Sequence, residues 1–186
     1  MTRATGLLAL LLLSSVAPAL AAPTDGIWTL RERFCVTVNG KRQCGAGREQ
    51  FMLLETVAWY RPAPDDAWTE IGTVVTSGSK LTIVVSREGV GRLIAARVGA
   101  DVSDLLQNFV FTYSGRHRGS RIAFGRIRVS VDIATEETSY RIRGRGTFTG
   151  RRVGDAYPVP PPEPPGDLDL GALTALAAVV SGDAAR

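Results

Sequence analysis

CVTVNGKRQC, residues 35–44, is the stretch that decides the fold. Its central pair Asn39-Gly40 is the strongest short hairpin signal, because a type I′ turn needs two residues that tolerate a positive φ. A two-residue turn there places Cys35 opposite Cys44 in a non-hydrogen-bonded pair, where Cβ atoms lie closest. A disulfide requires that short separation. Turn chemistry and cysteine positions therefore predict the same antiparallel register, with two free thiols as the alternative.

The first 21 of the 186 residues are typical of a secretory signal peptide. Arg3 supplies the charged start, residues 7–13 the apolar core, and Ala19-Leu20-Ala21 the cleavage site. The apolar run is shorter than the roughly 20 residues of a membrane-spanning helix, so we expect no transmembrane helix. Two cysteines in an exported chain favour a disulfide. We therefore predict a secreted or periplasmic protein cleaved near Ala21, with a buried N-terminal helix as the alternative.

Alternating apolar and polar residues predict β-strands along most of the chain. In the first strand, residues 27–38, the even-numbered side chains are apolar except Glu32, and we expect them to face the core. Further strands are expected at residues 68–76, 80–86, 93–98, 109–113, 122–133 and 140–149. The apolar positions change parity near Gly125, which predicts a β-bulge at that glycine.

Alternation alone does not decide the secondary structure of three segments. Residues 49–60 suit a helix or a strand, and we favour a strand because their neighbours are strands. Residues 88–91 predict a turn, and residues 101–107 predict one helical turn with Asp101 as its cap. Eight or nine strands with mostly short connections predict an all-β antiparallel meander. We expect this meander to close into a small up-and-down barrel, with a two-sheet sandwich as the alternative.

The composition divides the chain into a signal peptide (1–21), a β-barrel domain (22–154), a proline-rich linker (155–166) and a short apolar tail (167–186). Six prolines within residues 157–165 are typical of a polyproline linker. The tail has apolar residues at helical spacing and is expected to be disordered or to form one helix. The linker and tail together resemble the bacterial PEP-CTERM sorting signal, without its arginine cluster.

Gly26-Ile27-Trp28, at the start of the first expected strand, resembles the G-x-W motif of the lipocalins. The resemblance implies a small β-barrel that binds an apolar ligand in its interior. It also implies that Trp28 closes one barrel end and packs against an arginine near the last strand, a role that Arg151 or Arg152 matches. Thr112-Tyr113 lacks the aspartate of the T-D-Y motif of that family.

A candidate ligand site lies inside the predicted barrel. Glu32 is expected to face inward near Gly144 and Gly146 if the first and last strands close the barrel. Two glycines there leave room for a ligand, which Trp28 would also line. In the alternative interpretation the glycines mark a tight barrel corner, and Glu32 pairs with a buried arginine.

A second candidate site is a face rich in arginine. Residues 115–153 hold ten arginines and three acids in a chain of formal charge +4. Two adjacent strands contribute Arg126, Arg128, Arg141, Arg143 and Arg145 to one outer surface if they pair. Guanidinium groups bind phosphates and carboxylates bidentately, so an anionic glycan or lipid is the expected partner. Nucleic acid is the least expected partner because no aromatic residues are interleaved for base stacking. The alternative is a solvated sheet face that resists aggregation.

Residues typical of catalysis are scarce. His117 is the only histidine, and we expect it to be a solvated residue of an arginine-rich turn. One histidine and two bridged cysteines leave no usual zinc site. Ser77 and Lys80 fit an S-x-x-K pattern, but they lie in a predicted hairpin and lack the companion motifs. We therefore predict no catalytic residues, no metal and no cofactor.

These observations favour a non-catalytic, exported, monomeric β-barrel. We expect it to bind a small apolar ligand in its interior or an anionic polymer on its arginine face. The alternative is a structural or envelope-associated protein without a ligand cavity. An enzyme is disfavoured by the missing motifs, although paired carboxylates would leave that class open.

Overall fold

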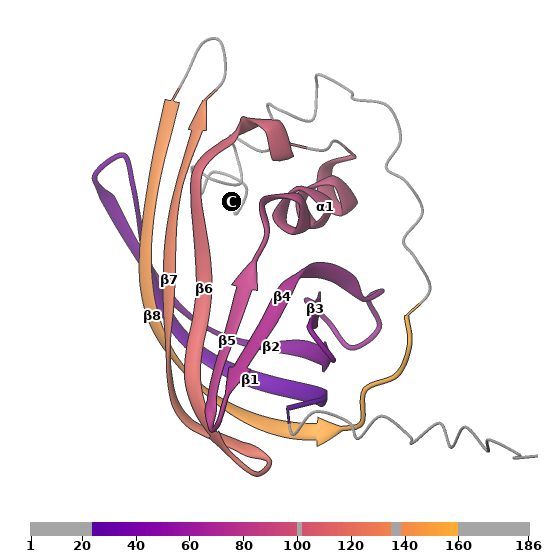
Figure 1. Ribbon diagram of the computed structural model, residues 1–186. Coiled ribbons are helices and arrows are strands. Elements are labelled where there is room, and N and C mark those ends of the chain that lie inside the picture. Colours follow the sequence, from indigo (N-terminus) through magenta and orange to yellow (C-terminus); the bar gives the residue numbers. More distant parts are fainter. Residues whose placement is uncertain (1–23, 100–101, 135–138, 160–186) are drawn as a thin grey trace, which may run out of the picture.

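The computed structural model describes residues 24–99, 102–134 and 139–159, with the side chains of residues 97 and 98 left out. Eight antiparallel strands follow one another in sequence order and close into a barrel (Figure 1). The predicted up-and-down meander is therefore confirmed in its closed form, not as a two-sheet sandwich. The signal peptide (1–21), the tail (167–186) and residues 160–166 of the linker lie outside the described residues.

The strands and helices have the following bounds. The barrel is formed by β1 (Gly26–Val38), β2 (Lys41–Leu54), β3 (Val57–Arg61), β4 (Thr69–Ser77), β5 (Lys80–Val85), β6 (Leu106–Arg118), β7 (Arg121–Ala134) and β8 (Ser139–Gly154). Between β5 and β6 the chain forms the helix α1 (Arg87–Val98) and the short 3-10 helix η1 (Ser103–Leu105). The helical turn expected at residues 101–107 is thus present as η1, and its expected cap Asp101 lies outside the described residues.

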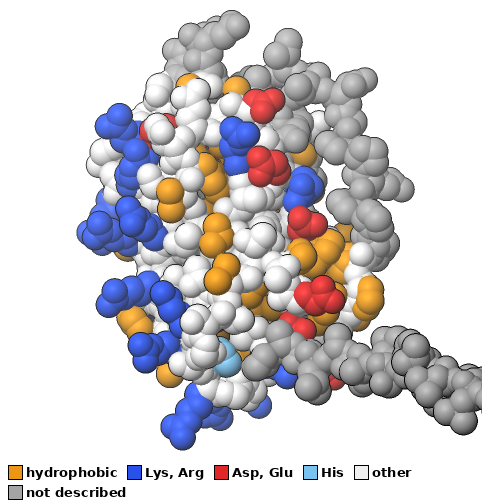
Figure 2. Space-filling model, viewed as in Figure 1, with side chains coloured by type: hydrophobic (Ala, Val, Ile, Leu, Met, Phe, Trp, Pro, Cys, Tyr) orange, Lys and Arg blue, Asp and Glu red, His pale blue; other side chains and the backbone are white. Residues whose placement is uncertain are grey.

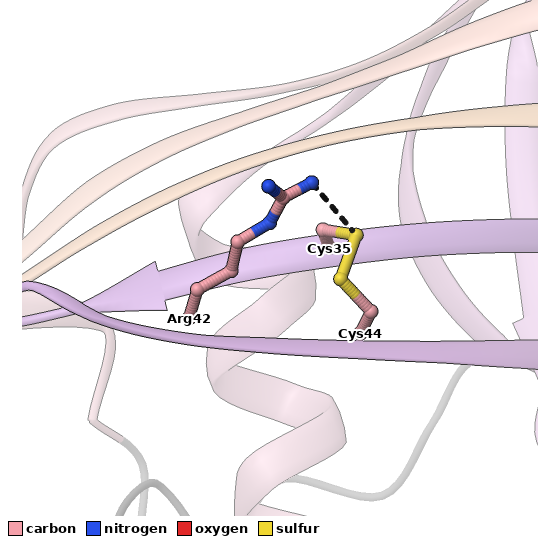
Figure 3. The surroundings of a disulfide bond; sticks show 3 residues. All are labelled: Cys35, Arg42 and Cys44. Carbon is pink, nitrogen blue, oxygen red and sulfur yellow. Dashed lines mark hydrogen bonds between the residues drawn. A yellow bond between two sulfur atoms is a disulfide. The ribbon is translucent and has the colours of Figure 1, made fainter.

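The β1–β2 hairpin has the predicted register. Asn39 and Gly40 have φ angles of 45° and 86°, as a type I′ turn requires. Cys35 lies opposite Cys44 with 4.0 Å between their Cα atoms, and the two form a disulfide. Figure 3 shows this disulfide beside Arg42, whose Nη2 lies 3.5 Å from Cys35 Sγ. The even-numbered residues Trp28 to Glu32 of β1 are buried, so the predicted inward face is confirmed for this part of the strand, whereas residues 34–38 are all half-buried.

Pairing of β1 with β8 closes the barrel from Ile27 opposite Gly154 to Val38 opposite Ile142. Asn39 extends this contact to the hairpin turn. Its backbone N–H donates to the carbonyl of Arg141 at 3.2 Å, and its Oδ1 accepts from the Arg141 N–H at 2.9 Å. The tip of the β1–β2 hairpin is therefore fixed to the last strand of the barrel.

The predicted β-bulge at Gly125 is present. The register between β7 and β8 shifts between Ile122 and Gly125, and Phe124 on the bulge is 56% exposed. Gly125 packs directly against the buried ring of Phe148. A Cβ atom added to Gly125 would stand 2.8 Å from Cδ1 of that ring. The bulge thus allows Ile122 and Ile127 both to be buried although they differ in parity.

The expectation for residues 88–98 was wrong. A turn and a strand were predicted, whereas residues 87–98 form α1. Ser86 caps this helix by accepting a 2.9 Å hydrogen bond from the Gly89 N–H, and Gly99 ends it with a φ of 77°. Gly89 lets the helix pack closely on β4, since a Cβ added there would stand 2.5 Å from Ile71 Cα. Gly89, which suggests a turn in the sequence, is thus compatible with a helix because of this tertiary contact.

Residues 49–60 form two strands and the turn between them. β2 continues through Gly45 and Gly47 to Leu54, and β3 starts at Val57. Glu55 provides the turn with a φ of 55°. The preference for strand over helix is therefore confirmed, with a hairpin where a single strand was expected.

Candidate ligand cavity inside the barrel

A cavity of about 840 Å³ lies within the barrel. Side chains of β1 to β7 form its walls, and α1 forms one further side, at the barrel end where β5 ends and β6 begins (Figure 1). Its rim includes the solvent-exposed residues Pro62, Ala63, Asp66 and Ala96. Small-molecule sites in proteins occupy about 300–1,000 Å³, so this volume suits a small ligand.

Aromatic rings form much of the cavity wall. Phe51 lies at the centre of this group, with its ring centroid 5.3 Å from Tyr60 and 5.1 Å from Tyr113, both in edge-to-face geometry. Phe111 stacks on Tyr113 at 5.3 Å, and Phe34 adds a fifth ring to the lining. These rings come from β1, β2, β3 and β6, so the closed barrel alone brings them together.

The helix α1 contributes an aliphatic side to the cavity. Val90, Leu93 and Ile94 lie at helical spacing and line the same cavity as the aromatic residues of β1, β2 and β6. Arg92 on the same helix points to β4, where its guanidinium donates to the carbonyl of Glu70 at 2.8 Å. The Ser86 cap, the Gly89 contact and this hydrogen bond together fix α1 on the barrel.

The cavity also holds a buried carboxyl group. Glu32 is 8% exposed, and the hydroxyl of Tyr113 donates a hydrogen bond to it. Its Oε1 atom is buried and has no hydrogen-bond partner among the described residues. Burial, together with repulsion from Glu49, raises the pKa of Glu32 to about 8, although the Tyr113 hydrogen bond acts in the opposite direction. The pKa of Tyr113 is likewise raised, chiefly by burial.

Of the predicted interior residues, only Glu32 lines this cavity. Gly144 and Gly146 face Phe34, and Cβ atoms added to them would stand 2.5 Å from Phe34 Cζ and 2.8 Å from Cδ2. The room that these glycines leave is therefore filled by a ring of the protein itself. Trp28 is also buried away from the cavity, with its Nε1 donating to the carbonyl of Thr24 at 2.8 Å.

Trp28 and Arg152 are partners across β1 and β8, whereas Arg151 is exposed on the outer surface. Arg152 also lies against Gly26, since a Cβ added to that glycine would stand 3.0 Å from Arg152 Cδ. Gly26 and Trp28 of the G-x-W motif thus meet Arg152 at one end of the barrel. The lipocalin resemblance assigns Trp28 and an arginine to this position.

The five predicted arginines share one outer surface. Arg128 lies opposite Arg145 on β7 and β8, and all five side chains are exposed. The same surface continues onto β1 and β2 and forms what we call the cationic face. It comprises Arg31, Arg33, Arg42, Arg48, Arg121, Arg126, Arg128, Arg141, Arg143, Arg145 and Arg151. Figure 2 shows basic side chains gathered at the left of the molecule and acidic ones to the right.

Asp132 is the only acid at the outward positions of β7, β8, β1 and β2, all of whose residues are described. Its Oδ1 lies 2.8 Å from Arg143 Nη1 and 3.8 Å from Arg141 Nε. Hydrogen bonds from Arg143 and from Asn108 lower the pKa of Asp132. The guanidiniums of the cationic face otherwise have no ion pair within this face.

Sequence reasoning missed most of the cavity wall. Phe34, Phe111 and Tyr113 fall on alternating positions that indicate a buried face, but they do not indicate a hollow interior. The pattern does not indicate the α1 residues of the wall either, because it predicts a turn at residues 88–91 and a strand at residues 93–98. His117 lies on β6 and not in a turn, and its ring nitrogens are buried without a hydrogen-bond partner among the described residues.

The described part of the chain contains no group of three or more His, Cys, Asp or Glu side chains that could hold a metal ion. Neither α1 nor η1 has the length and hydropathy of a membrane span. No model of a known protein family matches the chain, and neither a curated protein nor a solved structure matches it. The closed eight-stranded meander is nevertheless the architecture that the lipocalin resemblance implies.

Proposed function

We propose that this protein is an exported, non-catalytic, lipocalin-like barrel that binds a small, largely apolar ligand in its interior. The observation that carries this proposal is the cavity of about 840 Å³ with walls of aromatic and aliphatic side chains. A cavity of this kind supports ligand binding over a purely structural role, for which the interior would be filled by side chains. The Cys35–Cys44 disulfide is consistent with an oxidising compartment outside the cytoplasm.

A neutral fluorescent probe tests this proposal. N-phenyl-1-naphthylamine is uncharged at pH 7, and its emission rises when it enters an apolar site. We expect saturable binding to the wild type and loss of binding in Leu93→Trp, because a larger ring on α1 fills the cavity. Val84→Trp is the matched control, since Val84 is 40% exposed and does not line the cavity. Equal binding to both variants would contradict the proposal, provided that circular dichroism shows both to be folded.

A second candidate function is binding of an anionic polymer on the cationic face. Eleven exposed arginines on four adjacent strands favour it. Arrays of this kind attract phosphate, sulfate or carboxylate groups through charge-assisted hydrogen bonds that salt weakens. A polysaccharide or lipid headgroup of the cell envelope has the required charge.

Retention on immobilised heparin tests this second function. We expect the triple variant Arg126→Gln, Arg128→Gln, Arg145→Gln to elute at a lower salt concentration than the wild type. The control removes the same charge elsewhere, by Lys80→Gln, Arg87→Gln and Arg116→Gln, all exposed and outside the cationic face. Equal shifts in both triple variants would indicate that net charge, and not this face, determines retention.

A further inference from the structure

The cavity is acidic although the outer surface of the barrel is basic. Three carboxyl groups line it, those of Glu32, Glu49 and Asp66, and no lysine, arginine or histidine is among its described lining residues. A protein of formal charge +4 therefore encloses a site of the opposite sign. A ligand that carries a negative charge would meet three carboxyl groups there without a cation to pair with.

Glu32 is the best-placed of these groups to contact a ligand. Nine-tenths of it is buried, and it belongs to the cavity wall. The Tyr113 hydroxyl satisfies part of its hydrogen-bonding capacity, whereas Oε1 has no partner among the described residues. A buried acceptor without a donor carries a free-energy cost, which is larger when the acceptor is charged. A ligand donor at Oε1 would remove that cost.

The rings around the cavity favour a cationic donor. Phe34, Phe51, Tyr60 and Tyr113 line the same space as Glu32. The faces of aromatic rings attract ammonium groups within about 6 Å, and this attraction strengthens in a desolvated site. The aliphatic side chains of Ile71 and Leu93 offer a surface for an apolar body.

We propose that the cavity binds a small hydrophobic amine, with its ammonium group donating to Glu32 and its apolar part against the aromatic and α1 walls. This inference rests on the proposed function, because it assumes that the ligand site is the barrel interior. A neutral alcohol offers one donor but no charge to pair with the carboxylate, so its hydrogen bond is weaker. A fatty acid brings a like charge and is disfavoured.

Proton linkage follows from the same geometry. The other titratable groups that line the cavity with Glu32 are Glu49 on the neighbouring strand β2, Tyr60 on β3, Tyr113 on β6 and Asp66 in the loop before β4. Because the pKa of Glu32 is raised to about 8, its carboxyl is mainly protonated at pH 7 in the free protein. An ammonium beside it favours the carboxylate, so binding of the amine releases a proton. Affinity for the amine should therefore rise from pH 6 to pH 8.5.

Three probes of equal chain length test the proposal: n-octylamine, n-octanol and octanoate, each measured by displacement of N-phenyl-1-naphthylamine at pH 8. We expect octylamine to bind about tenfold more tightly than octanol, as a charge-assisted hydrogen bond would give, and octanoate to bind most weakly. In Glu32→Gln we expect octylamine to fall to the level of octanol, with octanol binding retained. Glu55→Gln, an exposed carboxyl outside the cavity, should leave the preference for the amine unchanged.

The outcomes separate this inference from the proposed function. If octanol binds the wild type and octylamine binds no better, the amine proposal is overturned while ligand binding stands. If no probe binds the wild type, the proposed function itself fails. Should Glu32→Gln not fold, calorimetry of octylamine binding to the wild type at pH 7 in phosphate and in Tris decides. Proton release supports the proposal, and its absence overturns it.

Discussion

Tyr113 on β6 donates a hydrogen bond to Glu32 on β1, and these two strands are not neighbours in the barrel. The contact therefore joins opposite walls of the cavity through polar groups surrounded by aromatic rings. Tyr113 is 4% exposed and Glu32 is 8% exposed, so water contributes little to either group. The strength of this pair should govern both the ionisation of Glu32 and the shape of the cavity.

Tyr113→Phe should raise the pKa of Glu32 further above its value of about 8. The Tyr113 hydroxyl stabilises the carboxylate by donating to it, and phenylalanine keeps the ring but removes the donor. Nuclear magnetic resonance of carboxyl-labelled glutamate, titrated from pH 5 to pH 10, measures this pKa. Tyr60→Phe is the matched control, because it removes a cavity hydroxyl that is not among the hydrogen-bond donors acting on the pKa of Glu32. Equal shifts of the Glu32 pKa in both variants would contradict the hydrogen bond from Tyr113 to Glu32.

The free energy of unfolding should fall as the pH rises from 5 to 8. Glu32 binds its proton more tightly in the folded state, with a pKa of about 8, than in the unfolded chain, whose value is near 4.5. The folded protein therefore holds more protons in this window, and its stability declines by at most about 1.4 kcal/mol per pH unit. Urea unfolding at several pH values measures the slope. Glu32→Gln should flatten the slope of the unfolding free energy against pH. If the substitution leaves the slope unchanged, Glu32 is not the group that causes it.

Local turn chemistry made the hairpin and its register predictable. Asn39-Gly40 and the paired cysteines determine which residues of β1 and β2 face each other without reference to the rest of the chain. The parity change at Gly125 likewise marks a bulge, because a strand must keep one apolar face toward the core. Consecutive antiparallel strands then favour closure into a barrel, because closure pairs the two edge strands of the meander with each other.

The helix and the cavity depend on contacts that a local pattern does not contain. Gly89 suits α1 because the backbone of Ile71 lies against it, and this contact exists only after β4 is placed. The cavity needs α1 at the barrel end together with rings from four strands. Alternation identifies each ring as buried, but filled and hollow interiors give the same alternation. At Gly144 and Gly146 the error has the opposite sign. The two glycines suggest an open space, but the ring of Phe34 fills it.

Reduction of the Cys35–Cys44 disulfide should lower the free energy of unfolding by about 2–3 kcal/mol, the value expected for a loop of this length. The barrel should nevertheless stay closed. The hairpin keeps its Asn39-Gly40 turn, and Asn39 remains bonded to Arg141 of β8. Urea unfolding with and without reductant measures the first effect, and near-ultraviolet circular dichroism the second. The double variant Cys35→Ser, Cys44→Ser should behave like the reduced protein and should not respond to reductant.

Gly89→Ala should destabilise the protein by more than 1 kcal/mol, although the same change stabilises an isolated helix by about that amount. The added Cβ would stand 2.5 Å from Ile71 Cα and 2.6 Å from its carbonyl carbon, which are backbone atoms of β4 and do not yield as a flexible side chain would. To relieve this contact α1 must move away from β4, and the cavity wall formed by Val90 and Leu93 moves with it.

Gly45→Ala is the control for Gly89→Ala, because nothing lies within 4 Å of a Cβ at that position on β2. We expect it to unfold at the same urea concentration as the wild type or at a slightly higher one. Binding of N-phenyl-1-naphthylamine should weaken in Gly89→Ala and stay unchanged in Gly45→Ala, since only the first displaces a wall of the cavity. If Gly89→Ala were as stable as the wild type, close packing of α1 on β4 would not explain the glycine, and its place in the helix would need another cause.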